Sequence, residues 1–251
     1  MSNEVYETET LLQEYLLFHY GTAREILPWP FGPKEALDYP VRCVTECVDP
    51  APLGPDSRAL DIGCATGRSS FELARHCGEV IAIDYSGVFI GAGSRIAAEG
   101  RLPYRYRVEG ERFAEAEARL PEGVDPNRVH FEQGDAMALR DDLGVFDVVL
   151  AANLICRLAE PRKFLRRLPE LVKPGGQLVI NTPFTWMTDY TPADNWIGAH
   201  PESGESLKAL KAELTDDFAV TGTANMPFLI REHSRKYQWS VAQSVRWVRK
   251  R

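Results

Sequence analysis

The sequence predicts an α/β fold in which a mostly parallel, doubly wound sheet of seven strands ends in an antiparallel hairpin. From Arg58 onward, short apolar runs alternate with segments of helical spacing, which is typical of strands joined by crossover helices. Near the C-terminus two strands follow each other with no clear helix between them. Together these observations indicate helices on both faces of one sheet, with the hairpin at one side.

Five apolar segments are expected to form the parallel part of the sheet. They lie at 59–62, 80–84, 129–131, 146–152 and 177–181. The last two strands are expected at 217–224 and 236–248. In the final strand, alternate apolar residues share one face, and this period of two indicates a strand: Tyr237, Trp239, Val241, Val245 and Trp247.

The chain has 251 residues, of which 44% are apolar, so one sizeable core is expected. We expect residues 57–251 to form this core unit and residues 1–56 to form an N-terminal helical lid. Helices are expected at 7–20 and 34–48; Thr10 with Gln13 would cap the first, and Gly21 would end it. Residues 100–128 carry six arginines and six acids, which predicts a charged, solvated helical excursion.

The composition restricts the classes of partner and location. A net charge of −7 argues against nucleic acid as a partner, although the basic stretch 231–251 leaves RNA as a weaker alternative. No segment approaches the roughly 20 apolar residues of a membrane span, and the acidic first residues do not resemble a signal peptide. We therefore expect a cytoplasmic protein with no membrane association. Its five cysteines are expected to be reduced thiols, with no metal site.

Three motifs at successive strand ends predict a nucleotide-like cofactor. Asp61-Ile62-Gly63-Cys64-Ala65-Thr66-Gly67 is a glycine-rich turn from strand to helix, where the backbone can approach a ligand closely. Asp84 ends the second strand, where a carboxylate can accept hydrogen bonds from both hydroxyls of a ribose. Asp135 follows the third strand and can accept a hydrogen bond from an adenine amino group. The carboxyl edge of an open α/β sheet is where such ligands bind.

This layout resembles the class I S-adenosylmethionine-dependent methyltransferases, which have a Rossmann-like fold. The resemblance covers residues 58–251 and implies S-adenosylmethionine as the cofactor and S-adenosylhomocysteine as the product. Arg42 is a candidate for binding the cofactor carboxylate. The other expected cofactor contacts are Asp61, Gly63, Ala65, Gly67, Asp84, Tyr85, Gly134, Asp135, Ala136 and Asn153.

A closer resemblance covers the whole chain, including its N-terminal helices. It is carried by segments 6–10, 14–21, 27–33, 131–135, 151–155 and 185–186. These segments resemble the methyltransferase found at the C-terminus of ovothiol synthase, a mercaptohistidine N-methyltransferase. The resemblance implies methyl transfer to an imidazole nitrogen of 5-thiohistidine, with a separately encoded sulfoxide synthase and a stand-alone methyltransferase.

The methyl acceptor is expected to meet polar and aromatic side chains beside the cofactor. Asn153 follows the fourth strand and is the leading candidate to choose which ring nitrogen faces the methyl group. Arg157 is a candidate for the substrate carboxylate, whereas His19 is expected to lie in the core or at the surface. Further candidates are Tyr6, Tyr15, Tyr20, Trp29, Asn181 and Trp186.

Two other functions remain open at this point. One is methyl transfer to another small amine or to a carboxylate. The other is a regulatory protein that binds the cofactor without chemistry, because a fold does not by itself establish catalysis.

Overall fold

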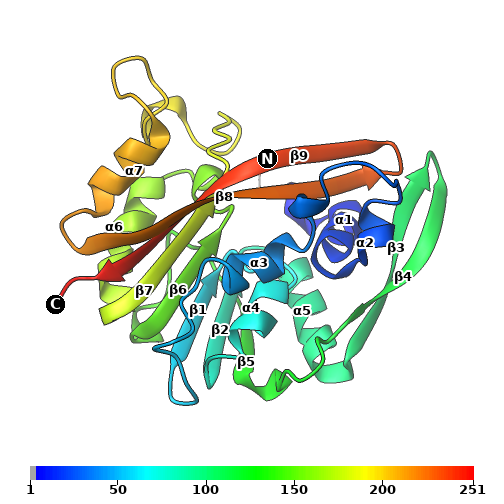
Figure 1. Ribbon diagram of the computed structural model, residues 1–251, viewed down its shortest axis with the longest axis horizontal. Coiled ribbons are helices and arrows are strands. Elements are labelled where there is room, and N and C mark those ends of the chain that lie inside the picture. Colours follow the sequence, from blue (N-terminus) through cyan, green and yellow to red (C-terminus); the bar gives the residue numbers. More distant parts are fainter. Residues whose placement is uncertain (1–3) are drawn as a thin grey trace.

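Figure 1 shows the computed structural model, which describes the backbone of residues 4–251 and the side chains of residues 6–251. A seven-stranded sheet has the order β5-β2-β1-β6-β7-β9-β8. Neighbours from β5 to β7 run parallel, and β9 pairs antiparallel with both β7 and β8. The expected fold class is confirmed. The strands are β1 (Arg58–Ile62), β2 (Glu79–Asp84), β5 (Val129–Gln133), β6 (Phe146–Ala152), β7 (Val172–Thr182), β8 (Phe218–His233) and β9 (Lys236–Arg249).

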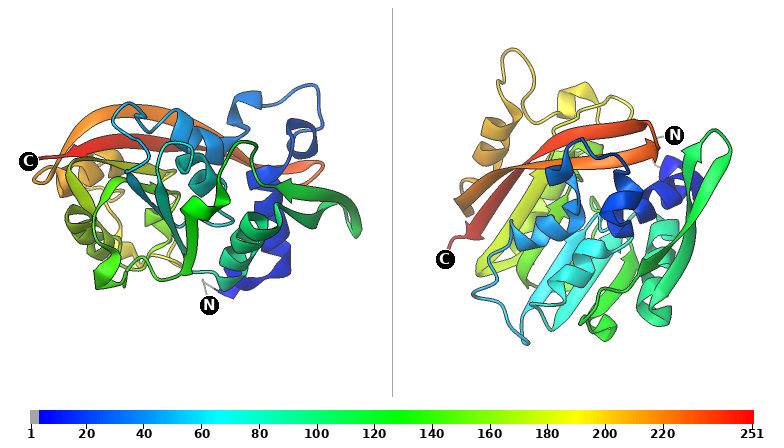
Figure 2. Two further views of the ribbon diagram at one scale, coloured as in Figure 1. Left: turned by 90° about the horizontal axis from the view of Figure 1, so that it is seen from below. Right: turned by 45° about the vertical axis from the view of Figure 1, so that its right-hand side comes forward.

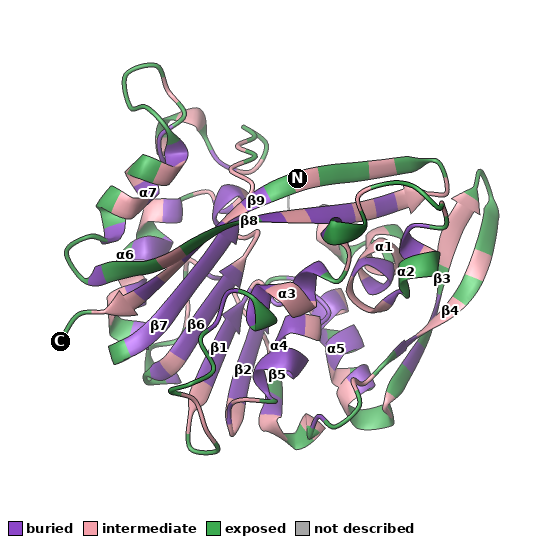
Figure 3. Cartoon of the chain, viewed as in Figure 1, coloured by how far each residue is buried: buried purple, intermediate pink, exposed green. Residues whose placement is uncertain are grey.

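Helices cover both faces of the parallel strands. One face packs against α3 (Tyr39–Thr45), α4 (Arg68–Leu73) and α5 (Gly87–Glu99), and the other against α6 (Pro161–Leu171) and α7 (Ser206–Leu214). Successive residues of one strand enter different cores, since Ala59 joins the first and Leu60 the second. Figure 3 shows the resulting burial of the central strands. This is why their sequences read as continuous apolar runs rather than alternating ones.

The N-terminal segment lies over one end of the sheet. It contains α1 (Glu9–Tyr20) and α2 (Ala23–Ile26), and α1 buries Leu16, Leu17 and Phe18. The cap of α1 is the Thr8 side chain, and the capping box in this region is Thr22 with Glu25 on α2. The prediction of a cap at Thr10 is therefore wrong by two residues, whereas the stop at Gly21 is confirmed. Short 3-10 helices lie between the other elements along the described chain. They are η1 (Glu4–Glu7), η2 (Lys34–Ala36), η3 (Pro126–Arg128), η4 (Asp141–Leu143), η5 (Ile155–Arg157) and η6 (Ala193–Asn195).

The single helix expected at 34–48 is two shorter pieces, η2 and α3. Asp38 stands between them with a φ of 54°, in the left-handed region. Pro40 occupies the first turn of α3, where its missing N–H costs no helical hydrogen bond. The break turns Tyr39 inward, and its side chain is 2% exposed.

Residues 100–128 are not a helical excursion but contain an antiparallel hairpin of β3 (Arg101–Glu109) and β4 (Arg112–Arg119). Leu102 faces Ala118, and Tyr104 faces Ala116, so small and large apolar residues pair across the ribbon. The charged residues alternate with them, and the mixed composition hid this period of two. Figure 2 shows the hairpin beside α1 and α5. The hairpin therefore covers one side of the N-terminal helix α1.

The C-terminal hairpin is longer than expected. The predicted strand 217–224 continues to His233, and β8 pairs with β9 over almost its whole length. Its far half leaves the main sheet and packs against α1, α2 and η2. All five cysteines are buried and unpaired. Within residues 4–251, no helix combines the length and apolar character needed to cross a bilayer.

The ring of Phe131 on β5 fills space that two glycines leave open. A Cβ on Gly67 or on Gly93 would lie 2.4 or 2.6 Å from this ring. Gly93 is buried in α5, whereas Gly91, two residues earlier, is exposed and has nothing within 4 Å of a Cβ. Substitution of Gly91 therefore reports helix propensity alone, whereas substitution of Gly93 in the same helix also reports packing against Phe131.

We predict opposite effects of alanine at these two positions of α5. Gly91→Ala should raise the free energy of unfolding by about 0.5–1 kcal/mol, because alanine loses less backbone entropy in a helix. Gly93→Ala should lower it, since forcing a methyl group into a packed core costs about 1–3 kcal/mol. Urea unfolding followed by circular dichroism measures both. Equal stabilisation by the two substitutions would contradict the packing of Phe131 against α5.

Candidate active site

A cavity of about 190 Å³ lies at the carboxyl ends of β1, β2, β5 and β6. The chain adds β2 and β5 on one side of β1 and then returns to place β6 on the other side. The cavity therefore lies at the topological switch point, where open α/β sheets bind their ligands. Its floor is formed by strand ends and its roof by α1, α3 and η1.

The glycine-rich loop after β1 forms the centre of the floor. Gly63, Ala65 and Gly67 all have a positive φ, of 75°, 47° and 83°. The backbone N–H groups of Gly63 and Cys64 donate to the carbonyl oxygen of Ile83, at 2.8 and 3.1 Å. The loop is thereby tied to the end of β2. Gly63 and Ala65 line the cavity, so backbone is exposed to a ligand there.

Asp84 links two of the turns that surround the cavity. Its carboxylate accepts hydrogen bonds from the backbone N–H of Ala65 at 2.8 Å and of Ser86 at 2.9 Å. Burial raises the pKa of this carboxyl, and the N–H groups of Ser86 and Ala65 oppose that rise. Each oxygen takes one N–H and keeps lone-pair capacity for a ligand hydroxyl.

The turn after β5 forms the far end of the cavity. Asp135 Oδ1 accepts a hydrogen bond from the backbone N–H of Met137 at 2.8 Å. Gly134, Asp135, Ala136 and Met137 all line the cavity. The arrangement offers a carboxylate next to apolar side chains, which suits the amino edge and the face of a purine ring.

Asp61 and Gly67 support the loop from below and do not line the cavity. The hydroxyl of Ser69 and the hydroxyl of Ser70 both donate to Asp61 Oδ2, at 2.8 and 2.7 Å. Burial raises the pKa of Asp61 to about 6, and the two serine hydroxyls oppose the rise. Asp61 thus joins the end of β1 to the start of α4. Gly67 leaves room for Phe131.

Asn153 follows β6 and faces the cavity beneath the roof. Its φ of 55° turns the side chain off the strand, and its N–H donates to the Asn181 carbonyl at 2.7 Å. The Tyr39 hydroxyl donates to Asn153 Oδ1 at 2.9 Å. This bond fixes the amide orientation and leaves the Nδ2 hydrogens as donors.

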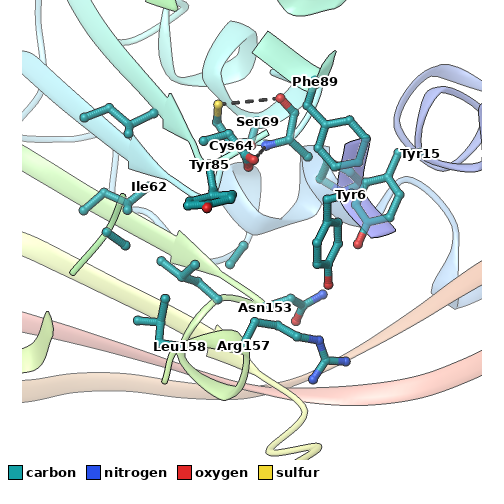
Figure 4. Close-up of a pocket in the computed structure, with 18 of the residues that line it drawn as sticks. Tyr6, Tyr15, Ile62, Cys64, Ser69, Tyr85, Phe89, Asn153, Arg157 and Leu158 are labelled. Carbon is teal, nitrogen blue, oxygen red and sulfur yellow. Dashed lines mark hydrogen bonds between the residues drawn. The ribbon is translucent and has the colours of Figure 1, made fainter. Parts of the chain in front are cut away.

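Arg157 brings a positive charge to the cavity, and no described acid forms an ion pair with it. Its Nη1 donates to the Thr185 carbonyl at 3.0 Å, and its guanidinium lies 4.7 Å from the centre of the Tyr190 ring. It also interacts with the Tyr6 phenol, whose pKa is raised by burial and lowered in part by Arg157. Figure 4 shows the Tyr6 hydroxyl near Asn153 and Arg157.

The roof is closed by aromatic rings and by a short strap, which is the η1 segment that carries Tyr6 and Glu7. Tyr15 packs on Phe89 with ring centres 4.8 Å apart, and Tyr6 meets both rings edge-on. Two hydrogen bonds between side chain and backbone hold the strap: Ser86 Oγ donates to the Tyr6 carbonyl at 2.9 Å, and the Gly87 N–H donates to Glu7 Oε1 at 3.0 Å. The roof is therefore attached to the turn that carries Asp84.

The structure brings many of the expected site residues to one cavity. Those that line it are Tyr6, Tyr15, Gly63, Ala65, Asp84, Tyr85, Gly134, Asp135, Ala136, Asn153 and Arg157.

The remaining candidates besides Asp61 and Gly67 lie outside the cavity lining and hold the surrounding elements together. Arg42 donates to the Pro227 carbonyl and forms an ion pair with Glu46, so its guanidinium is held away from the cavity. Tyr20 donates to the Thr66 carbonyl, Trp29 to the Ser234 carbonyl and Trp186 to Ser206 Oγ. Asn181 is fully buried behind Asn153.

Several lining residues had no signal in the sequence. Tyr39 and Cys43 come from α3, which was expected as a plain lid helix, and Tyr190 comes from the long segment after β7. His19, expected in the core or at the surface, also lines the cavity. Only the break at Asp38, invisible in the periodicity, turns Tyr39 toward Asn153.

Comparisons with known proteins agree with this geometry. Residues 60–178 match a family model described as a methyltransferase domain. The chain is 34% identical over 125 residues to the ubiquinone biosynthesis O-methyltransferase of Caulobacter sp. strain K31, covering 50% of this chain and 40% of that protein. It is 32% identical over 123 residues to the demethylmenaquinone methyltransferase of Clavibacter sepedonicus, covering 49% and 40%. The chain thus spans about two fifths of the length of these relatives.

Solved structures show the same fold at low sequence identity. The cyclase SpnF has a TM-score of 0.60 and 17% identity, over 99% of this chain and 95% of that one. The N-methyltransferase NodS from Bradyrhizobium japonicum WM9, in complex with S-adenosylhomocysteine, has a TM-score of 0.50 and 16% identity, over 78% and 79%. The matched residues 60–178 contain the glycine loop, Asp84, Asp135 and Asn153. Residues 60–178 of this chain therefore match a methyltransferase domain, and the chain shares its fold with a solved methyltransferase that binds S-adenosylhomocysteine.

Proposed function

We propose that the protein transfers the methyl group of S-adenosylmethionine to an imidazole ring nitrogen of 5-thiohistidine. The observation that carries the proposal is the presence, in one cavity, of a fixed amide and of a guanidinium that forms no ion pair with any described acid. Asn153 presents the second lone pair of Oδ1 as well as its Nδ2 donors, and no described acid pairs with Arg157. A zwitterionic amino acid with a polar ring matches both groups.

The floor of the cavity fits the cofactor. Asp84 would accept hydrogen bonds from the ribose hydroxyls, and Asp135 with Met137 would meet the adenine. The exposed backbone at Gly63 and Ala65 allows close approach of the remaining part. When bound, S-adenosylmethionine supplies a methyl group that its sulfonium already activates.

The roof of the cavity fits the methyl acceptor. Arg157 would pair with the α-carboxylate, because a guanidinium binds a carboxylate through a charge-assisted hydrogen bond. Tyr6, Tyr15 and Tyr190 would enclose the ring and exclude water. The remaining lone pair of Asn153 Oδ1 would accept the ring N–H, so that the other nitrogen, which keeps its own lone pair, points toward the cofactor. Holding the reactants in line supplies much of the acceleration.

The acid–base groups of the cavity favour a nucleophile that needs no deprotonation. Its described carboxylates, Asp84 and Asp135, both accept backbone N–H groups on the cofactor side. A neutral imidazole has a free lone pair near pH 7 and can attack without a strong base. This feature supports nitrogen as the acceptor atom.

A second candidate is methyl transfer to a phenol. The relatives named as ubiquinone biosynthesis O-methyltransferases favour it. Their similarity falls on about half of this chain, and the family model covers the cofactor-binding strands rather than α1, α3 and β8. A phenol has a pKa near 10 and would need a base beside Asn153.

The proposal is tested by incubating the purified protein with S-adenosylmethionine and one acceptor per tube. The acceptors are 5-thiohistidine, its decarboxylated analogue, histidine and a catechol, and mass spectrometry detects a gain of one methyl group. We expect methylation of 5-thiohistidine at a nitrogen, with a higher KM for the decarboxylated analogue because Arg157 has no partner. Methylation of the catechol alone would overturn the proposal in favour of the second candidate.

Asn153→Gly should separate turnover from cofactor binding. Glycine tolerates the positive φ at this position, so the backbone should remain in place while the amide is lost. We expect kcat to fall at least about tenfold, because the acceptor is no longer held in line. The affinity for S-adenosylhomocysteine, measured by calorimetry, should change by less than about threefold. Unchanged turnover would remove Asn153 from the acceptor site.

A further inference from the structure

His19 is a cavity residue to which neither the cofactor floor nor the acceptor roof assigns a role. It lies on α1, one turn after Tyr15, and lines the cavity together with Gly63, Cys64 and Ala65. Its Nδ1 is buried and has no hydrogen-bond partner among the described residues. A buried polar atom without a partner costs stability, so a partner from a ligand is the natural explanation.

The surroundings of His19 place it over the glycine loop. The next residue, Tyr20, donates to the carbonyl of Thr66 at 2.6 Å, which brings this end of α1 onto the loop. Arg68, which follows the loop, is close enough to lower the pKa of His19 further after burial has lowered it. The other neighbours of the ring are aromatic: Tyr15, Phe18 and Tyr20.

The order of the strands determines which part of the cofactor reaches this loop. Four residues mark the order along this edge of the sheet. Asp135 follows β5, Asp84 ends β2, Gly63 follows β1 and Asn153 follows β6. A cofactor with adenine at Asp135 and ribose at Asp84 must place its amino-acid end over the next strand, β1. His19 lines the cavity over that same loop.

We propose that His19 donates a hydrogen bond to the carboxylate at the amino-acid end of the cofactor. This inference rests on the proposed function. Burial lowers the pKa of His19 to about 3, so the ring is neutral and carries one N–H donor. The positive charge of Arg68, which acts on His19, favours a negative group on this side of the loop.

His19 would therefore let the site distinguish the complete cofactor from a nucleoside that lacks the amino-acid end. His19→Phe keeps an aromatic ring among Tyr15, Phe18 and Tyr20 and removes the donor. His19→Gln restores a donor on a side chain of similar reach. His130→Gln, on the exposed face of β5, is the matched control for loss of a histidine.

The test is calorimetric titration of each variant with S-adenosylhomocysteine and with methylthioadenosine, which has no amino-acid end. For His19→Phe we expect the affinity for S-adenosylhomocysteine to fall at least about tenfold and that for methylthioadenosine to change less than about twofold. His19→Gln should recover part of the loss, and His130→Gln should bind both like the unaltered protein. Thermal unfolding verifies that each variant is folded.

Three outcomes would overturn the inference. Equal losses for both ligands would give His19 a structural role only. Unchanged binding of both, with a raised KM for the acceptor, would place His19 at the acceptor instead. Unchanged binding and unchanged KM would leave it without a ligand. Failure of the unaltered protein to bind either compound is a different result, because it would reject the proposed cofactor site itself.

Discussion

The pair of backbone hydrogen bonds accepted by Asp84 is the constraint on which the site depends. One comes from Ala65 in the glycine loop and the other from Ser86 before α5. They hold the ends of β1 and β2 in one geometry and keep a buried carboxylate ionisable beside the cavity. Burial opposes the charge on Asp84, and the two N–H groups compensate for it. The floor is therefore already shaped for a ribose.

The roof depends on the same turn. Ser86 also donates to the Tyr6 carbonyl, and Gly87 donates to the Glu7 carboxylate. The strap that presents Tyr6 to Asn153 is thus attached next to the residue that would hold the ribose. Such an arrangement couples closure over the acceptor to the ordering of the cofactor turn. Loss of the strap would expose the acceptor side to water without dismantling the sheet.

Much of the fold was predictable because strand burial leaves a strong pattern. Each parallel strand is buried on both faces of the sheet, so it appears in the sequence as a short apolar run. The glycine loop and Asp84 identify the edge of the sheet where a ligand binds. The hairpin of β3 and β4 was missed because its charged face dominates the composition, and Leu102 and Tyr104 are its few large buried residues. A count of charges does not distinguish a solvated helix from a half-buried ribbon.

The site was predictable where it follows strand ends and unpredictable where it depends on helix packing. Asp84, Asp135 and Asn153 follow β2, β5 and β6, and all line the cavity. Tyr39 and His19 reach it only because α3 is broken at Asp38 and α1 lies across the loop. Arg42 carries the right charge but is held by Pro227 and Glu46. Residue type alone does not reveal which side chains already have partners.

A crystal structure with S-adenosylhomocysteine would show whether Asp84 holds the ribose. We predict adenine beside Asp135 and Met137, both ribose hydroxyls on Asp84, and the amino-acid end over Gly63, directed toward His19. The sulfur would then lie next to Asn153, below the ring of Tyr6. A ligand bound in the reverse direction, or outside the edge formed by β5, β2, β1 and β6, would contradict this prediction.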